Sequence, residues 1–297
     1  MPNTRIYWIH TLSPTHAGIG RGVGYIDLPI DRDGVTGWPI LRGSSFKGVW
    51  RDWAVQKALP NIDIAFGRAD KDAESANAGA LIPTDAKIVC LPVRSFRGTF
   101  AWVTSPLCLQ MLKRTLTLAG FTKVPEALAS LDEGKAHDTG TTSALRQGQQ
   151  IFLEDLDFVA ENCPTATAWA NFIAGKVFAG DSSWQVQFMK RFVVLPDLAF
   201  DFLCETGTEV NTRVRIDDET KTVVRSALWT EESLPSETIL MGLIQCERVF
   251  QKNGNNDPPI TPQALLSNFA KDPLTLQIGG KATVGRGQVR CMFTEVQ

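Results

Sequence analysis

Residues 16–51 combine a carboxylate in an apolar run, several glycines and a helix start with cations, in an order that suits chemistry on phosphate. The segment begins H-A-G-I-G-R-G-V-G-Y-I-D-L-P-I, where Asp27 is a lone acid in an apolar run. Further on, G-S-S-F-K-G-V-W-R opens an expected helix that carries Lys47 and Arg51. Bare backbone amides and a helix start beside cations favour an anion, and phosphate is the obvious one. The acid next to this site suggests a reaction on phosphate as well as binding.

The helix that follows the glycine loop is expected to start at a serine and to run to about residue 59. Ser44 or Ser45 is a suitable N-cap. Apolar residues then recur at helical spacing, namely Phe46, Val49, Trp50 and Trp53. We interpret the two tryptophans as core packing rather than as platforms for stacked bases.

A second glycine-rich element, I-G-G-K-A-T-V-G-R-G, lies near the C-terminus. Gly280 and Gly285 are spaced as in a P-loop, but Arg286-Gly287 replaces Lys-Ser/Thr and a strand follows where a helix is required. The pattern therefore excludes a nucleoside-triphosphate site. A plain tight turn is one alternative, and the density of glycines favours close approach of the backbone to a ligand.

Composition limits the classes of function. The chain has 297 residues, 43% of them hydrophobic, and a net charge of −2, so any nucleic acid must bind to local basic patches rather than to bulk charge. Six cysteines without a C-x-x-C pair argue against a zinc site or disulfides. Neither a long apolar run nor a signal peptide is apparent, and we expect a cytoplasmic protein.

Hydrophobic periodicity predicts a mixture of strands and helices. Strands are expected at 4–11 and 80–93, a hairpin around D-D-E-T at 211–229, a strand at 239–250, and a strand, glycine loop and strand at the C-terminus. Helices are expected at 105–120, 164–206 and 261–271, with a polar acidic loop at 60–79 and a long irregular excursion at 121–150.

Taken in order, these elements resemble the RAMP superfamily of CRISPR proteins. The stretches that carry the resemblance are H-A-G-I-G, D-L-P-I, T-G-W-P-I, G-S-S-F-K-G-V-W-R and I-G-G-K-A-T-V-G-R-G. The middle stretches A-L-I-P-T-D-A-K-I-V-C-L-P-V-R-S-F-R-G-T-F and N-T-R-V-R-I-D-D-E-T are similar to the backbone subunit of type III-B (Cmr) effector complexes, which cuts target RNA. The similarity runs from about residue 5 to the C-terminus and is weakest over 121–206.

The resemblance implies an α+β fold with an RRM-like (ferredoxin-like) core in one domain, 1–297. It implies insertions at about 60–79 and 121–206, the latter helical, and a β-hairpin thumb at about 207–230. The implied partners are a CRISPR guide RNA, target RNA, further copies of the chain in a filament and other effector subunits, with no membrane.

The resemblance also implies a site. Asp27 matches the cleaving aspartate, and Ser44, Ser45 and Lys47 match guide-backbone contacts, whereas Asp31 and Asp33 inherit no role. The residues expected to bind RNA are Gly18, Gly20, Gly43, Ser44, Ser45, Lys47, Arg51, Arg97, Asn211, Arg213, Gly279, Gly280, Lys281, Gly285, Arg286 and Gly287.

The expected chemistry uses the 2′-OH of the target RNA as nucleophile. A thumb that flips a nucleotide would allow in-line attack, while Asp27 accepts the proton or holds a divalent cation, Mg²⁺ or Mn²⁺, shared with phosphate oxygens. His16 is either an assisting acid or a hydrogen-bonded structural residue. Asp27 as a turn cap, Lys47 as a solvated lysine, and Arg213 with Arg215 as cross-hairpin pairs remain alternatives.

Two other functions compete with an RNA-guided endoribonuclease. The first is a guide-RNA scaffold in which Asp27 is inert, and a cleavage assay separates it from the enzyme. The second is an enzyme acting on a small phosphorylated substrate, which leaves the two basic glycine elements at opposite chain ends unexplained.

Overall fold

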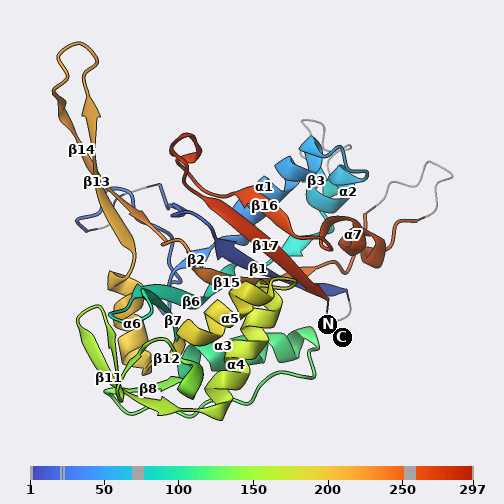
Figure 1. Cartoon of the computed structure of the whole chain (residues 1–297). Coiled ribbons are helices and arrows are strands. Elements are labelled where there is room, and N and C mark those ends of the chain that lie inside the picture. Colours follow the sequence, from blue (N-terminus) through green and yellow to red (C-terminus); the bar gives the residue numbers. More distant parts are fainter. Residues whose placement is uncertain (1–2, 21, 23, 69–76, 251–258, 296–297) are drawn as a thin grey trace.

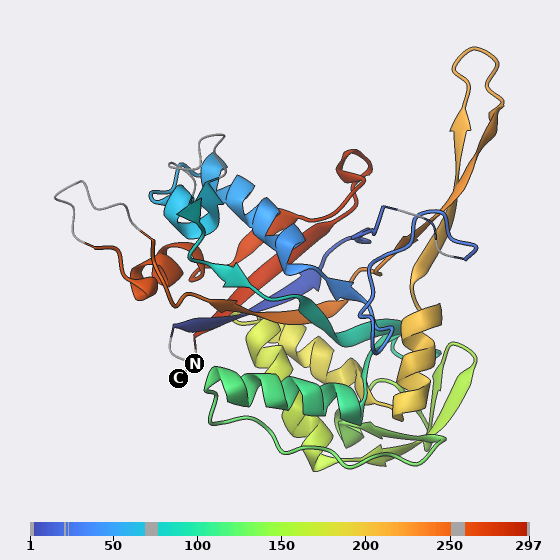
Figure 2. The same cartoon turned by 180° about the vertical axis from the view of Figure 1, so that it is seen from behind.

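The architecture is a curled mixed sheet of thirteen strands with helices on both faces (Figures 1 and 2). A computed structural model describes residues 3–20, 22, 24–68, 77–250 and 259–295. The strands follow one another in the order β16 (Leu274–Gln277), β17 (Gln288–Glu295), β1 (Thr4–Thr11), β15 (Ile239–Gln245), β6 (Ala86–Arg94), β7 (Phe100–Thr104), β12 (Phe192–Val194), β8 (Lys135–Asp138), β11 (Leu156–Asn162), β10 (Gln150–Leu153) and β9 (Arg146–Gln147). Two short strands join this path, β2 (Ile40–Leu41) beside β6 and β5 (Ile82–Pro83) beside β15.

Strand β1 shows how the sequence divides the core. Its side chains alternate between the two faces of the sheet, as the period of two requires. Tyr7 and Ile9 belong to the core under α1 (Gly43–Gln56), whereas Ile6 and Trp8 belong to the core under α3 (Pro106–Ala119). The strand is buried on both sides, and it is confirmed where the sequence predicted it.

Helices cover both faces of the sheet. One core includes residues of α1, α2 (Ile62–Phe66) and α7 (Pro262–Phe269). The opposite core includes residues of α3, α4 (Pro164–Val177) and α5 (Ser182–Arg191), and α6 (Asp197–Thr206) packs in a third cluster. Trp50 is fully buried with its ring 5.3 Å from that of Phe46, so core packing is confirmed as its role.

The segment 121–206 is more regular than the sequence indicated. The expectation of an irregular excursion at 121–150 is confirmed for 121–134, which contains no helix or strand, and is wrong for the rest, where β8 and β9 extend the main sheet. The helical expectation for 164–206 is confirmed in α4, α5 and α6, although β12 runs between them in the sheet. These strands are short and partly polar, so local alternation does not reveal them. Strand β8 is defined by its pairing with β11 and β12, whereas β9 pairs locally with β10.

A long β-hairpin projects from the body beside the N-terminal loops (Figures 1 and 2). Its strands are β13 (Glu209–Ile216) and β14 (Val223–Ser233). Asp217 closes the turn by accepting hydrogen bonds from the backbone N–H groups of Glu219 and Thr220, at 3.1 and 2.8 Å. This Asx turn explains why D-D-E-T predicted the hairpin correctly.

The expectation of a loop at 60–79 is wrong in part, because a short helix and two short strands lie there. Residues 60–79 contain α2 and the paired strands β3 (Gly67–Arg68) and β4 (Asn77–Ala78), with 69–76 outside the described residues. A 3₁₀ turn, η2 (Ala282–Val284), interrupts the final glycine loop. All six cysteines are unpaired. Within the described ranges, no helix is long and apolar enough to cross a bilayer.

Candidate RNA-binding and cleavage site

The two glycine elements, far apart in sequence, meet in one cleft. The backbone N–H of Gly280 donates to the carbonyl of His16 at 3.0 Å. A cavity of about 330 Å³ lies between the two segments. Six residues predicted from the sequence line it, namely His16, Gly18, Gly20, Ser45, Gly279 and Gly280, together with Ala17, Leu28, Asp31 and Arg42. The two glycine elements, one near each end of the sequence, therefore contribute to a single site.

Several of the glycines are required by the chain itself rather than by a ligand. A Cβ on Gly279 would lie 2.2 Å from the His16 carbonyl, and one on Gly287 would lie 2.1 Å from that of Ile278. Gly43 is buried against the backbone of Pro83 in the same way. By contrast, Gly20 and Gly285 have positive φ and open space around them. Close approach of a ligand can therefore account only for glycines that have open space around them, such as Gly20 and Gly285.

The start of α1 differs from the expected anion site. The helix begins at Gly43, and its N-cap is Arg42, so the prediction of Ser44 or Ser45 as N-cap is wrong. The first amide already donates to Asp85 Oδ1 at 2.8 Å. Arg42 in turn lies between two carboxylates, with Nε 2.6 Å from Asp31 Oδ2 and Nη1 3.0 Å from Asp85 Oδ2. An internal acid thus occupies the place that was expected for phosphate.

The side chains of the first turns of α1 remain available. Ser44 and Ser45 are exposed, and Lys47 is half-buried. Burial lowers the pKa of Lys47, and no described residue forms an ion pair with it. Arg51 lies 3.7 Å from Asp63 in an exposed pair, which leaves most of its charge free for another anion.

Asp27 is exposed at the base of the hairpin. It does not itself line the cleft, but its neighbour Leu28 does. Its Oδ2 accepts hydrogen bonds from the backbone N–H of Thr230 at 2.8 Å and from the Thr230 hydroxyl at 3.0 Å. The two bonds lower the pKa of Asp27 below its ordinary value, the backbone bond having the larger effect. The carboxylate is therefore ionised at neutral pH and attractive to cations.

His16 forms the floor between Gly18 and Gly280. Its Nδ1 lies 2.6 Å from the carbonyl of Glu232, and because a carbonyl only accepts, Nδ1 carries the proton. In the neutral ring Nε2 is then an acceptor, and it lies 2.5 Å from where a Cβ on Gly18 would be. The buried, hydrogen-bonded structural histidine weighed from the sequence matches this geometry.

The base of the hairpin is held by ion pairs to the C-terminal glycine element. Lys281 Nζ lies 2.7 Å from Glu231 Oε1, and Arg286 Nη1 lies 3.2 Å from Glu209 Oε2. Arg213 Nε is 3.5 Å from Glu231 Oε2 across the hairpin. Lys281 and Arg286 were expected to contact RNA, and for Arg213 pairing across the hairpin was the alternative to RNA contact. The acids of the hairpin neutralise part of the charge of all three cations.

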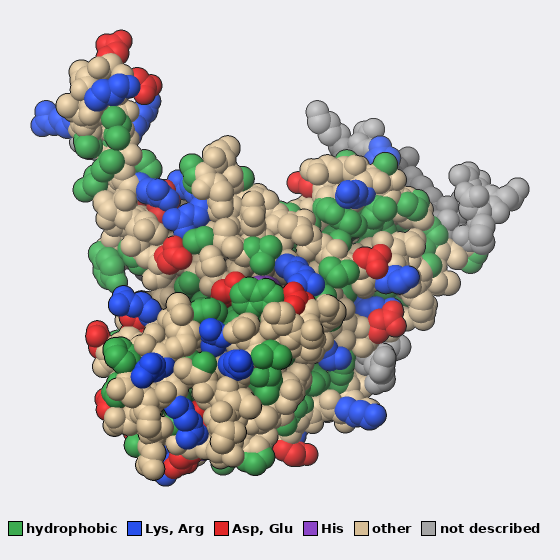
Figure 3. Space-filling model, viewed as in Figure 1, with side chains coloured by type: hydrophobic (Ala, Val, Ile, Leu, Met, Phe, Trp, Pro, Cys, Tyr) green, Lys and Arg blue, Asp and Glu red, His purple; other side chains and the backbone are tan. Residues whose placement is uncertain are grey.

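The hairpin itself has two different faces. Arg213 is registered opposite Trp229 and Asn211 opposite Glu231, so the polar and aromatic side chains share one face. Val214 is registered opposite Leu228, and both are exposed on the other face. Figure 3 shows lysine and arginine side chains gathered near the hairpin base and again toward its tip.

Arg97 lies apart from the rest of the predicted set. It is exposed in the turn between β6 and β7, next to β10, where Phe96 N–H donates to the Phe152 carbonyl. It does not line the glycine cleft.

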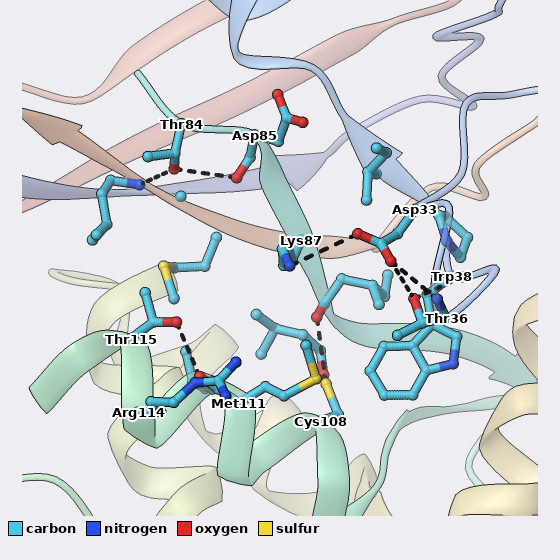
Figure 4. A pocket seen from close by; sticks show the side chains of 18 residues that line it. Asp33, Thr36, Trp38, Thr84, Asp85, Lys87, Cys108, Met111, Arg114 and Thr115 are labelled. Atoms are coloured by element: carbon cyan, nitrogen blue, oxygen red, sulfur yellow. Dashed lines mark hydrogen bonds and ion pairs between the residues drawn. The ribbon is translucent and has the colours of Figure 1, made fainter. Parts of the chain in front are cut away.

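Two other hollows do not suit RNA. One, of about 240 Å³, lies between β6 and α3 and is largely apolar, with Lys87 paired to Asp33 at 3.8 Å (Figure 4). The other is a groove below the hairpin whose described lining includes one cation, Arg32. Its acids are Asp31, Glu133, Asp155, Asp157, Asp201, Glu205 and Glu232. Phosphate would be repelled there.

Sequence reasoning missed Thr230, Glu231 and Glu232, which fix Asp27, Lys281 and His16. A threonine and two glutamates at the end of a strand give no local signal. Among the described residues no cluster of three metal-ligating side chains occurs. No described donor outside the Asp27 residue itself forms a hydrogen bond with its Oδ1.

This chain is similar in sequence and in fold to known proteins. The RAMP superfamily model matches residues 8–290. The CRISPR system Cmr endoribonuclease Cmr4 of Pyrococcus furiosus is 35% identical over 97% of this chain and 95% of its own. The crystal structure of oligomeric Cmr4 from Pyrococcus furiosus superposes with a TM-score of 0.73 at 27% identity, covering 99% of this chain and 98% of that one.

A chain of a type III-B Cmr-beta complex bound to cognate target RNA shares the fold, with a TM-score of 0.70 at 22% identity over 98% of this chain and 96% of that one. The family match and the 35% identity leave no other family to consider. This chain belongs to the RAMP superfamily and, within it, to the Cmr4 proteins of CRISPR Cmr systems.

Proposed function

We propose that this chain is the guide-RNA-binding backbone subunit of a type III CRISPR ribonucleoprotein and that it cleaves the complementary target RNA at regular intervals. The observation that carries this proposal is the convergence of both glycine elements, the first turn of α1 and the Asp27 loop at the base of one hairpin. A relative with 35% identity is named an endoribonuclease, and a related chain is oligomeric. We therefore infer RNA, further copies of this chain and other effector subunits as partners.

The finer architecture supports this role. The antiparallel order β17, β1, β15, β6, with α1 and α7 on one face, follows the strand–helix–strand–strand–helix–strand path of a ferredoxin-like fold. We propose that these elements are an RRM-like core of one domain, 1–297, into which about 60–79 and 121–206 are inserted. The hairpin at about 207–230 then serves as a thumb over the RNA.

In this proposal the guide backbone lies along the glycine cleft and the first turns of α1. Ser44 and Ser45 offer exposed hydroxyls, and Lys47 offers an uncompensated charge. The acidic groove below the hairpin keeps phosphate away from the opposite side. The RNA therefore has one favourable path, between the cleft and the polar face of the hairpin.

The proposed reaction is attack of a target 2′-oxygen on the adjacent phosphate, which breaks the bond between phosphorus and the 5′-oxygen of the next nucleotide. The products are a 2′,3′-cyclic phosphate and a 5′-hydroxyl, whose oxygen takes its proton from solvent. Asp27 faces solvent with Oδ1 available to accept the 2′-OH proton or to hold Mg²⁺ or Mn²⁺. A bound cation would supply charge that polarises the phosphate. An acid role for His16 would require a second proton on Nε2, so we assign the cleavage step to Asp27 and the cleft floor to His16.

The test is Asp27→Asn in the reconstituted complex. We expect cleavage to fall by about a hundredfold or more, with assembly and target affinity unchanged, and wild-type products at a fixed spacing. Asp157→Asn is the control, because the Asp157 side chain lies in the acidic groove, outside the cleft, and has no described hydrogen bond or ion pair. Wild-type cutting by Asp27→Asn would instead establish a non-catalytic guide-RNA scaffold.

A further inference from the structure

The Asp27 loop contains no regular strand, yet hydrogen bonds fix it against the hairpin. The N–H of Leu28 donates to the Thr230 carbonyl at 3.0 Å, and the N–H of Glu232 donates to the Leu28 carbonyl at 2.9 Å. The loop thus runs beside the end of β14 in the manner of an added strand, with Leu28 bridged in parallel to Glu231. The position of Asp27 depends on where the hairpin sits.

Thr230 adds contacts that an ordinary strand residue would not make. Its N–H and its hydroxyl both point at Oδ2 of Asp27, at 2.8 and 3.0 Å. The same hydroxyl oxygen accepts from the backbone N–H of Asp27 at 3.0 Å. The hydroxyl also lies 3.2 Å from the carbonyl of Tyr25, in the same loop. Backbone and side chain of Asp27 are therefore both bonded to Thr230, through Oδ2 and not through Oδ1.

We propose that Thr230 is a positioning residue for RNA cleavage: it fixes one oxygen of the Asp27 carboxylate so that the other faces the target strand, and it couples that orientation to the seating of the hairpin. This inference rests on the proposed function of Asp27. A substrate duplex that presses on β13 and β14 acts on the strand that orients the reacting group. Cleavage is thereby tied to correct engagement of the hairpin.

Thr230→Val tests the hydroxyl, because valine keeps the shape and the backbone N–H but cannot donate from its side chain. Thr230→Ser restores the hydroxyl. Thr230 is half-buried, so the structure has room for either side chain. Thr212→Val is the matched control, since Thr212 is registered directly opposite Thr230 and has no described hydrogen bond to the Asp27 loop.

The measurement is single-turnover cleavage of guide-paired RNA by the assembled complex, together with target affinity. We expect Thr230→Val to lower the cleavage rate by about tenfold with affinity within about twofold, and Thr230→Ser and Thr212→Val to stay within about twofold of wild type. Should Thr230→Val fail to assemble, Thr230→Ala takes its place with the same expectation.

Two results would overturn the inference. One is an unchanged cleavage rate in Thr230→Val; the other is a loss confined to affinity or assembly, since a purely structural threonine would act there. Asp27→Asn, assayed in parallel, separates this inference about Thr230 from the proposed nuclease function on which it rests. If Asp27→Asn cuts normally, the proposed nuclease fails; if it is inactive while Thr230→Val is normal, only the role of Thr230 fails.

Discussion

Lys281 Nζ lies 2.7 Å from Oε1 of Glu231, and this ion pair joins the C-terminal glycine loop to the base of the hairpin. Glu231 is 6% exposed and also accepts a hydrogen bond from the indole N–H of Trp229 at 2.6 Å. Lys281 Nζ lies 5.7 Å from the centre of the Trp229 ring. The carboxylate therefore fixes the cleft and the hairpin relative to each other.

Removing that cation should destabilise the fold. Lys281→Met leaves a nearly buried carboxylate without its closer ion-pair partner, and we expect the free energy of unfolding to fall by about 1–3 kcal/mol. Lys221→Met, at the exposed hairpin turn and without a described ion pair, should change it by less than about 0.5 kcal/mol. Urea unfolding of the isolated chain measures both, and equal effects would contradict the assignment.

The same carboxylate makes stability depend on pH. Burial alone would raise the pKa of Glu231, but hydrogen bonds from Lys281 and Trp229 outweigh it and hold the pKa below its ordinary value. A lowered folded pKa adds stability above the unfolded pKa, and this is lost as pH falls through the folded pKa. Between about pH 5 and 3, wild type should lose more stability than Glu231→Gln. A steeper loss in Glu231→Gln would show the opposite sign.

The parts of the site that were predictable rest on local patterns. The alternation in β1 and the turn residue Asp217 determine their elements through neighbours in sequence, and the helical spacing of Phe46 and Trp50 does the same for α1. The role of Asp27 as the cleaving aspartate was predicted from the resemblance to the RAMP superfamily. The signals for β1, the hairpin turn and α1 are each contained within about a dozen residues, which is why sequence alone suffices for these elements. The role of Asp27 rests on similarity over most of the chain and stays a prediction.

The parts that were not predictable depend on distant contacts. Asp85 reaches the start of α1 from 42 positions away, and its carboxylate changes the expected anion site into an internal cap. Thr230 reaches Asp27 from 203 positions away. Nothing in either local sequence indicates these pairings, because only the completed sheet brings the residues together.

Lys47 offers a test of the RNA path. Lys47 is half-buried, burial lowers its pKa, and no described residue forms an ion pair with it. A phosphate bound beside Lys47 would therefore interact with a positive charge that no described acid neutralises. Lys47→Met should weaken guide-RNA binding and reduce the salt dependence of log K by about one unit. Lys57→Met, at the exposed end of the same helix, should leave the slope unchanged. Equal slopes for Lys47→Met and wild type would remove Lys47 from the RNA surface.

The last prediction concerns whether Asp27 acts by holding a divalent cation or by accepting the 2′-OH proton directly. Its lowered pKa makes it a weak base but a reliable anion, which suits a cation shared with phosphate oxygens. Chelation should then abolish cleavage without releasing the guide RNA, and Mg²⁺ or Mn²⁺ should restore it. Sulfur at the scissile phosphate should slow cleavage in Mg²⁺ by about tenfold or more and slow it less in Mn²⁺, because Mn²⁺ tolerates a softer ligand. Undiminished cleavage in a chelator would mean that the carboxylate accepts the 2′-OH proton itself, and Asp27→Asn would then remove activity in every metal alike.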